Sequence, residues 1–490
     1  MHSSFSPVHA GNFKVDRPYI SRQRNPFNDK RRHAIWLDLQ ERMLWNQSCV
    51  IHQLSKDEAE SARFYRFLGN AQVSVEELIY MNCQVKTELL TNRHVLVLGD
   101  STSYNLKSHM GRIQDAERIG VLDDNKTPGF MTHVHLAVDA SNQNVLGLAD
   151  ILLWSRSRAK GKKPLNYLRD WQDKESYKWA LGIDNASAIL QKAACRTFVL
   201  DRDADNYDLF LKFYQEGKDH FVIRSRWDRQ VQWEDQQLSM NNCLEQSSCL
   251  GTYTLDLAEL DHYSSTSGKR HKRKARQATI EVRACPVTIL PPSTPNHPGG
   301  PAIPVHIIEA REVGIPPDSK EPAVTWRLIS SHPAGTFEQA KELILFYVLR
   351  WIIEQLFRTS KKKGFDLEAT QLETFDAIQR QTVMVLHTAA KVLQLVYARG
   401  KFDGQPIEEV FDENEQAALH LINQKYQGRT EKQKNPYPES QTSWATWIIA
   451  RLGGWKGYES RKPPGPITIK RGLDQFYIFL QAFHMLKPSG

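Results

Sequence analysis

The stretch "HVLVLGD" (94–100) decides the fold, because its unbroken apolar run followed by glycine and aspartate predicts a buried strand that ends in an acid. Two further strand-like stretches follow, "THVHLAVD" (132–139) and "VLGLADILLW" (145–154). A helix is expected to begin near "KESYKWALG" (174–182), and "TFVLD" (197–201) is expected to form another strand. Three strands, a helix and a further strand predict a mixed α/β sheet covered by helices.

The composition is that of a soluble globular protein, with 40% hydrophobic and 24% charged residues in a chain of 490, enough for two to four domains. The formal net charge of +8 is modest, but basic residues cluster in "DKRRH" (29–33), "KGKK" (160–163), "GKRHKRKAR" (268–276) and "KKK" (361–363). These clusters are compatible with a polyanionic partner, most simply nucleic acid. Ordinary solvated surface is the alternative for each cluster.

The six cysteines include no CxxC pair, and no paired histidine spacing completes a zinc site, so we expect reduced thiols in the cytoplasm. The N-terminus has no apolar signal core. Arg350 and Glu354 interrupt the apolar run at 343–357, which therefore does not predict a membrane span.

Helical spacing dominates both ends of the chain. Near the N-terminus we expect a helix capped by Asn28 or Asp29, a second with a capping box formed by Ser55 and Glu58, and a third from about Ser74 to Leu90. The expected domains are a helical N-terminal region (1–90), a first core part (91–227), a β-rich insertion (228–330), a helical second core part (331–400), and a helical C-terminal region (401–490).

One helix is expected in "FYVLRWIIEQLFRTSKKKG" (346–364). At about 100° per residue, Tyr347, Arg350, Glu354 and Lys361 fall on one stripe, roughly opposite the apolar face. An amphipathic surface helix, in which Glu354 pairs with Arg350 and Arg358, explains the stripe without any special role.

Two acids elsewhere give Glu354 a second interpretation. Asp100 and Asp201 each follow an apolar strand-like run, and the carboxyl ends of strands are where α/β sheets tend to hold their chemistry. With a helical glutamate they would form a cluster of hard oxygen ligands suited to magnesium and to phosphoryl transfer. A role as turn or cap residues is the alternative for each aspartate.

Several motifs together resemble the insertion-sequence-four group of bacterial DDE transposases, typified by the transposon-five transposase. They are "GDSTS" at Asp100, "LDRDADNYDLF" at Asp201, and the Y-x2-R-x3-E-x6-K spacing from Tyr347 to Lys361. "FYRFLGNAQVS" (64–74) and "WATWIIARLGG" (444–454) stand in the order expected for the group. The resemblance implies a ribonuclease-H-like core with a β-rich insertion. It also implies a cut-and-paste DNA transposase that cleaves transposon ends through a hairpin intermediate and joins them to target DNA.

By the same resemblance, Asp100, Asp201 and Glu354 are the catalytic, metal-binding acids, and the cofactor is Mg²⁺ with Mn²⁺ as a substitute. Tyr347, Arg350 and Lys361 would contact phosphates near the cleaved end. Trp326 would hold a flipped base, or else be a core aromatic, while Arg224 would hold a phosphate or neutralise an acid.

The expected partners are double-stranded DNA, as terminal inverted repeats and as target, and a second copy of the chain, in a bacterial cytoplasm and without a membrane. The N-terminal helices are expected to bind the transposon end, with a set of likeliest contacts comprising Arg31, Arg32, Tyr65 and Arg66. The C-terminal stripe of Phe476, Phe479, Leu480 and Phe483 is expected to support pairing of two subunits, with packing inside one chain as the alternative. A non-catalytic DNA-binding regulator and a ribonuclease-H-like nuclease without strand transfer are the alternative functions.

Overall fold

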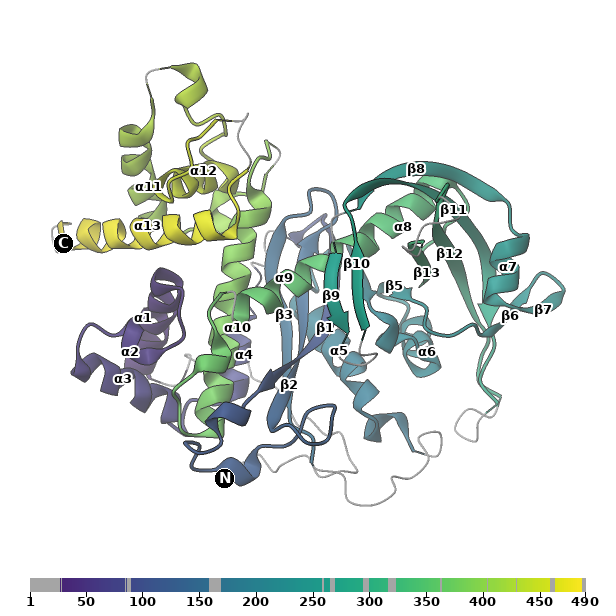
Figure 1. Ribbon diagram of the computed structural model, residues 1–490, viewed down its shortest axis with the longest axis horizontal. Helices are drawn as coiled ribbons and strands as arrows, with labels where there is room; N and C mark the ends of the chain where they lie inside the picture. Colours follow the sequence, from purple (N-terminus) through teal and green to yellow (C-terminus); the bar gives the residue numbers. More distant parts are fainter. Residues whose placement is uncertain are drawn as a thin grey trace. The chain divides into compact units, whose positions relative to one another are not determined.

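The computed structural model describes the chain from Phe27 to Leu486 with gaps (Figure 1). The described residues are 27, 29–83, 85, 90–157, 169–257, 260–264, 269–293, 299–315, 323–361, 364–402, 404–428, 430–458 and 463–486. The basic cluster at 160–163 and two lysines of the cluster at 361–363 lie outside them.

The chain divides into two compact units. The first unit consists of residues 1–163, 172–196 and 351–490, and the second of residues 164–171 and 197–350. Both units contain strands and helices, so the mixed α/β class expected from the sequence is confirmed.

The first unit contains an antiparallel sheet in the order β3-β2-β1, formed by β1 (His94–Asn105), β2 (Gly129–Asp139) and β3 (Val145–Trp154). All of β2 is buried. The expectation that the first strand ends at Asp100 is wrong: β1 continues to Asn105, and Asp100 pairs with Val134 in its middle. Residues 101–104 are polar or aromatic, so the hydrophobicity pattern does not predict that the strand continues through them. Each of them nevertheless pairs with a residue of β2.

A long helix, α10 (Phe375–Ala398), forms the centre of the first unit and is buried along most of its length (Figure 1). It packs on β3 and on helices from both ends of the chain. The other helices of this unit are α1 (Lys30–Asn46), α2 (Ile51–Leu54), α3 (Glu58–Gly69), α4 (Val75–Asn82), α5 (Lys178–Ile189), α9 (Trp351–Ser360), α11 (Glu413–Tyr426), α12 (Thr442–Leu452) and α13 (Pro466–Leu486). Short 3₁₀ turns are η3 (Lys107–His109), η4 (Ala116–Arg118), η7 (Glu175–Tyr177), η9 (Leu367–Ala369), η10 (Ile407–Glu409) and η11 (Glu431–Gln433).

The N-terminal helices agree only in part with the sequence-based expectations. Asp29 caps α1, as one of the two expected caps, by accepting a hydrogen bond from Arg31 N. The predicted capping box at Ser55 is wrong, because α3 begins later and its cap is Asp57, which accepts from Glu60 N. Ser74 does cap α4, but this helix ends at Asn82 rather than near residue 90.

The second unit is built on a longer sheet in the order β4-β5-β13-β12-β11-β6-β7, with β8 also paired to β11. Among the described strands of this unit, β4 and β5 pair in parallel and the other pairs are antiparallel. Its strands are β4 (Cys195–Leu200, of which Thr197 onward belongs to this unit), β5 (His220–Arg224), β6 (Gln230–Trp233), β7 (Gln236–Ser239), β8 (Cys249–Leu257), β11 (Arg276–Ile289), β12 (Ile303–Val313) and β13 (Thr325–Ser330). A separate hairpin pairs β9 (Leu260–Ser264) with β10 (Lys269–Arg273).

Strands predominate among the described residues between 228 and 330, with one short helix, α7 (Met240–Gln246), among them. The long strand pair β11 and β12 continues the same sheet as β5 through β13. Two further helices of this unit are α6 (Tyr207–Glu216) and α8 (Phe337–Leu349).

The single helix expected over 346–364 is wrong in one respect: it is divided at Arg350 into α8 and α9. Thr336 and Gln339 form a capping box at the start of α8. At its end, Arg350 N donates to Tyr347 O at 3.1 Å, a 3₁₀-type bond that tightens the last turn. Among the residues of the predicted stripe, Tyr347 is buried and Arg350, Glu354 and Lys361 are half-buried.

Candidate active site

One face of β1 brings Asp100, Thr102 and Tyr104 together, because alternate residues of a strand point to the same side. Lys361, directly after α9, donates from Nζ to Thr102 Oγ1 at 2.7 Å. Its Nζ also lies 5.2 Å from the centre of the Tyr104 ring. The Tyr104 hydroxyl is 2.9 Å from Ser360 Oγ. These contacts fix the C-terminal end of α9 on the face of β1 that carries Asp100.

The electrostatics of this contact follow from burial. Burial lowers the pKa of Lys361, while the nearby Glu368 acts in the opposite direction. Burial also raises the pKa of the enclosed Tyr104 hydroxyl. The first unit thus holds a cation in a partly desolvated position two residues along the strand from Asp100.

Asp100 itself is half-buried, and its Oδ1 accepts a hydrogen bond from Ser101 N at 2.7 Å. On the opposite face of β1, Ser101 Oγ is 2.9 Å from Nδ1 of the buried His133. Burial, with His135 and Lys178 nearby, holds the pKa of His133 well below its usual value. The ring of Trp179 on α5 packs against His133 with centroids 4.3 Å apart. A neutral, tightly packed histidine therefore supports the strand behind Asp100.

Glu354 lies in the first turn of α9, so Asp100 and Glu354 belong to the first unit. Asp201 belongs to the second unit, where it directly follows β4 as the sequence predicts. It is half-buried and caps the 3₁₀ turn η8 (Arg202–Ala204) by accepting from Asp203 N at 2.8 Å. The capping role that sequence reasoning kept as an alternative is thus present.

Arg224 ends β5, the parallel neighbour of β4. Because Leu200 is in register with Ile223, Asp201 and Arg224 leave the sheet at the same edge. Arg224 is half-buried at this position.

Trp326, Tyr347 and Arg350 meet in the second unit. The ring centroids of Trp326 on β13 and Tyr347 on α8 are 6.4 Å apart, and the Arg350 guanidinium carbon is 5.9 Å from the Tyr347 ring centre. Trp326 is half-buried rather than a fully enclosed core residue. Lys361 does not share this unit, so the four members of the predicted stripe are divided between the two units.

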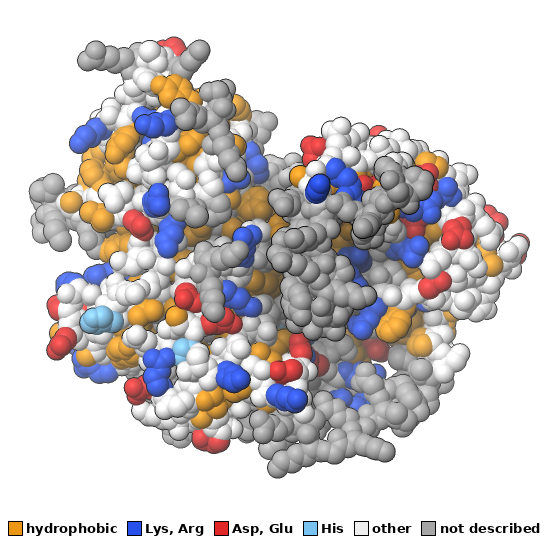
Figure 2. Space-filling view, viewed as in Figure 1, with side chains coloured by type: hydrophobic (Ala, Val, Ile, Leu, Met, Phe, Trp, Pro, Cys, Tyr) orange, Lys and Arg blue, Asp and Glu red, His pale blue; other side chains and the backbone are white. Residues whose placement is uncertain are grey.

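The predicted N-terminal contacts have different environments. Arg31 and Arg66 are exposed at the first turn of α1 and the last turn of α3. Arg32 donates to Phe27 O at 3.1 Å, and Tyr65 is half-buried. On the face drawn in Figure 2, basic and acidic side chains are interspersed over this part of the first unit. The helices therefore offer single exposed arginines, with no continuous basic surface on that face.

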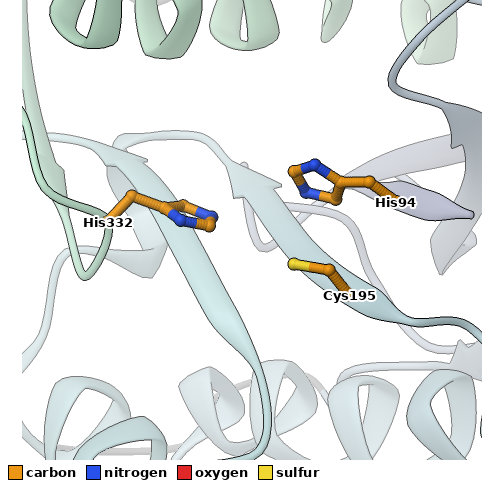
Figure 3. A group of neighbouring side chains, drawn as sticks. All are labelled: His94, Cys195 and His332. Carbon is orange, nitrogen blue, oxygen red and sulfur yellow. The ribbon is translucent and has the colours of Figure 1, made fainter.

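Figure 3 shows two neighbouring side chains of the first unit, His94 at the start of β1 and Cys195 at the start of β4. A ring nitrogen of His94 and the Cys195 sulfur lie within 4.8 Å. Six residues of strand, about 20 Å, separate His94 from Asp100, so this pair is remote from the acid. His332, also drawn, belongs to the second unit, where its Nε2 is 2.7 Å from Thr197 Oγ1.

Residues 167–390 match a family described as the transposase DDE domain. The match covers fewer than half of the 490 residues. It contains two of the three predicted acids, Asp201 and Glu354, and leaves Asp100 and the N-terminal helices outside. The comparison supports a DDE transposase. No helix among the described residues is long and apolar enough to cross a membrane.

Sequence reasoning missed the residues that surround the acids. Thr102 and Tyr104 could have been found from the period of two that starts at Asp100, had the strand been extended past residue 100. His133 gives no such signal, because a histidine in an apolar run is compatible with any buried position.

Proposed function

We propose that the protein is a metal-dependent DNA transposase of the cut-and-paste type, in which Asp100, Asp201 and Glu354 are the catalytic acids. The observation that carries this proposal is the docking of α9 on β1 through Lys361 and Thr102. The match of residues 167–390 to the transposase DDE domain supports the same reading. Membership of the insertion-sequence-four group and a ribonuclease-H-like core are part of the proposal.

The docking supports a meeting of Asp100 and Glu354. Glu368, seven residues after Lys361, contacts Asn105 N at 3.2 Å, so the chain around α9 follows β1 in the same direction. Counting back from Lys361, Glu354 lies two turns, about 10 Å, earlier on the same helical face. Counting back from Thr102, Asp100 lies about 7 Å earlier on the same strand face. This count supports the proposal that the two carboxylates meet near the N-terminal end of α9.

The donor set fits a divalent metal. Carboxylate oxygens are the ligands that magnesium prefers, and each of the three acids is half-buried, open enough to receive waters and phosphate oxygens. Mg²⁺, or Mn²⁺ in its place, would neutralise charge that develops on the reacting phosphate and favour in-line displacement.

The remaining site residues have roles that their own chemistry supports. Arg350 and Arg224 would hold phosphate oxygens by paired hydrogen bonds, and Lys361 would act as a single charge. Tyr347 would position Arg350, which lies over its ring. Trp326, half-buried beside Tyr347, would stack on a base that leaves the duplex.

The reaction would proceed in four steps, each of which breaks one phosphodiester bond. Water first cleaves one strand at the transposon end and releases a 3′-hydroxyl. That hydroxyl attacks the opposite strand, joins the two strands in a hairpin and releases the flanking DNA; a second water reopens the hairpin. Finally the same hydroxyl attacks target DNA. Two subunits would hold two ends together for these steps.

The test compares Asp100→Ala, Asp201→Ala and Glu354→Ala with Glu342→Ala, an exposed acid on α8 that serves as the matched control. The DNA is a duplex with the inverted repeat found beside the gene. We expect each triad variant to lose cleavage by more than about 100-fold in Mg²⁺, since even changes to groups that orient metal ligands cost about 10- to 100-fold. End binding should persist in all four proteins. Near-native cleavage by any triad variant would remove that residue from the site.

The same assay separates the alternatives. A non-catalytic DNA-binding regulator would bind the ends and show no cleavage in the unmodified protein. A nuclease without strand transfer would cleave and never join the ends to target DNA.

A further inference from the structure

The loop after β5 in the second unit holds an exposed tryptophan that the proposed reaction has not used. Trp227 is 58% exposed, although tryptophan is among the side chains that folding usually covers. The Arg226 guanidinium carbon lies 5.1 Å from the centre of its ring. The pair forms a flat aromatic and cationic surface, which we call the Trp227 platform (Arg226 and Trp227).

The buried carboxylate of Asp205 holds the backbone of the platform in place. Asp205 is 4% exposed, and its Oδ2 accepts hydrogen bonds from Arg226 N at 2.6 Å and from Trp227 N at 3.2 Å. Its Oδ1 accepts from Arg229. Arg226 is tied further by a 3.1 Å bond from Nη1 to Asp203 Oδ1. A buried acid that accepts successive backbone N–H groups fixes the loop, so the exposure of Trp227 is not the result of a loose segment.

The position of the loop relates the platform to the proposed chemistry. β4 and β5 are parallel with Leu200 opposite Ile223, so the chain leaves both strands at one edge. Asp201 is the first residue beyond β4, and Trp227 is the third residue beyond β5. Arg226 also bonds Asp203, two residues after Asp201. The platform and the proposed catalytic aspartate therefore share one edge of the sheet within one unit.

The chemistry of the platform favours a nucleobase. A base presents a flat aromatic face that stacks on an indole, and its phosphates are attracted by the guanidinium beside it. Arg202 and Arg226 are both exposed at this edge, and Arg226 pairs there with the exposed Asp203. Both guanidinium groups can reach a phosphate at the surface. Arg226 covers part of the indole, and the rest of the ring is open to a partner.

We propose that the Trp227 platform binds an unpaired base of the DNA strand next to the cleaved phosphate, by stacking on Trp227 and by attraction of its phosphate to Arg226. This inference rests on the proposed function. The platform would hold a frayed or unpaired nucleotide beside Asp201, at a place distinct from Trp326.

The test measures binding of a fluorescein-labelled ten-residue oligothymidylate to the full chain by anisotropy over a range of salt concentrations. We expect Trp227→Ala to weaken binding about tenfold and to leave the salt dependence unchanged, because stacking releases no counterions. Trp227→Phe should retain most of the affinity. Arg226→Gln should lower the slope of log K against log salt by about one. Tyr214→Ala, another exposed aromatic of the same unit, is the matched control and should bind as the unmodified protein does.

Three outcomes decide the matter. If Trp227→Ala bound the oligothymidylate as tightly as the unmodified protein, the proposal that Trp227 stacks on a base would be wrong. Trp227 would then contact a protein partner or no partner. A protein that binds and cleaves duplex ends but does not bind the oligothymidylate would also overturn the platform while the proposed function stands. A protein that binds neither DNA would overturn the proposed function itself, and the platform with it.

Discussion

At the scale of single residues, the contact of Lys361 with Thr102 and Tyr104 is the most informative feature of the first unit. Partial desolvation of the Lys361 ammonium disfavours its charged form and lowers its pKa. Favourable contacts must therefore offset the cost of placing the charge there. Here one hydrogen bond and one aromatic ring offset that cost. The ammonium keeps two further N–H donors, which a phosphate oxygen could accept.

We predict that Lys361→Met weakens binding of the transposon end and lowers the slope of its salt dependence by about one, because one phosphate contact is lost. Methionine retains the aliphatic packing on Tyr104, so the thermal unfolding temperature should change little. Fluorescence anisotropy at several salt concentrations measures both quantities. If the slope of log K against log salt did not change, Lys361 would make no phosphate contact and would serve only to hold α9 on β1.

At the scale of elements, the buried strands and the amphipathic helices could be predicted, while their ends could not. The β2 and β3 strands are rich in apolar residues and were located from sequence. The extension of β1 beyond Asp100 depends on pairing with β2, and the division at Arg350 depends on a local 3₁₀ bond. Neither feature has a sequence pattern, because both result from long-range pairing or backbone geometry rather than from periodic burial.

The packing of α10 on α4 makes a prediction about acid. His387 on α10 is half-buried, and its Nδ1 is 2.9 Å from Asn82 O at the end of α4. Desolvation of the imidazole lowers its pKa to about 4. The unfolded chain takes up this proton near pH 6.5, so His387 destabilises the fold progressively as the pH falls from about 6.5 toward 4. From the two pKa values, the loss at pH 5 is about 2 kcal/mol.

Hydrogen exchange of the α10 amides at pH 7.5 and 5.0 measures this loss. In His387→Gln the loss between the two pH values should be smaller by about 2 kcal/mol than in the unmodified protein. The comparison with the variant is needed because Glu41, whose pKa burial raises to about 7, contributes with the opposite sign. Equal losses in both proteins would show that His387 is not neutral in the folded state.

At the scale of the whole molecule, the packing of the C-terminal helix α13 shows which residues of the predicted stripe remain available for contact with a second subunit. Phe476 and Leu480 of the predicted stripe are buried inside the chain, where α13 packs on α12, α11 and α1. Packing within one subunit, the alternative kept at the sequence level, therefore accounts for these two residues. Phe479 remains 37% exposed and its neighbour Ile478 is 59% exposed. A surface for a second copy on α13 would use this outward pair.

We predict that Ile478→Asp combined with Phe479→Asp blocks the complex of two subunits with two DNA ends and preserves binding of a single end. Two charges on an exposed face leave the fold intact but cannot be buried in an interface without partners. Sedimentation of the protein with end DNA distinguishes the two complexes. Paired complexes that persist in the folded double variant would remove this face of α13 from the interface.

The candidate site residues were predictable where a motif coincides with the end of a strand or with a helical period. Asp201 follows β4 as expected, and Glu354 and Lys361 were singled out by their helical spacing. The supports of the site, such as the Lys361 bond to Thr102 and the Asp205 anchor of the β5 loop, join residues far apart in sequence or buried in a loop. A single sequence carries no period or motif for such contacts, so they became visible only in the structure.

The most direct test of the central claim is the joining of a transposon end to target DNA. Pre-cleaved ends with a free 3′-hydroxyl are incubated with supercoiled plasmid, protein and Mg²⁺, and the products are sequenced across the junctions. The proposed function predicts covalent junctions between the 3′ end and the plasmid with the unmodified protein, and none with Glu354→Gln or with Mg²⁺ removed by a chelator. Cleavage of DNA without any junction, or equal joining by Glu354→Gln, would contradict it.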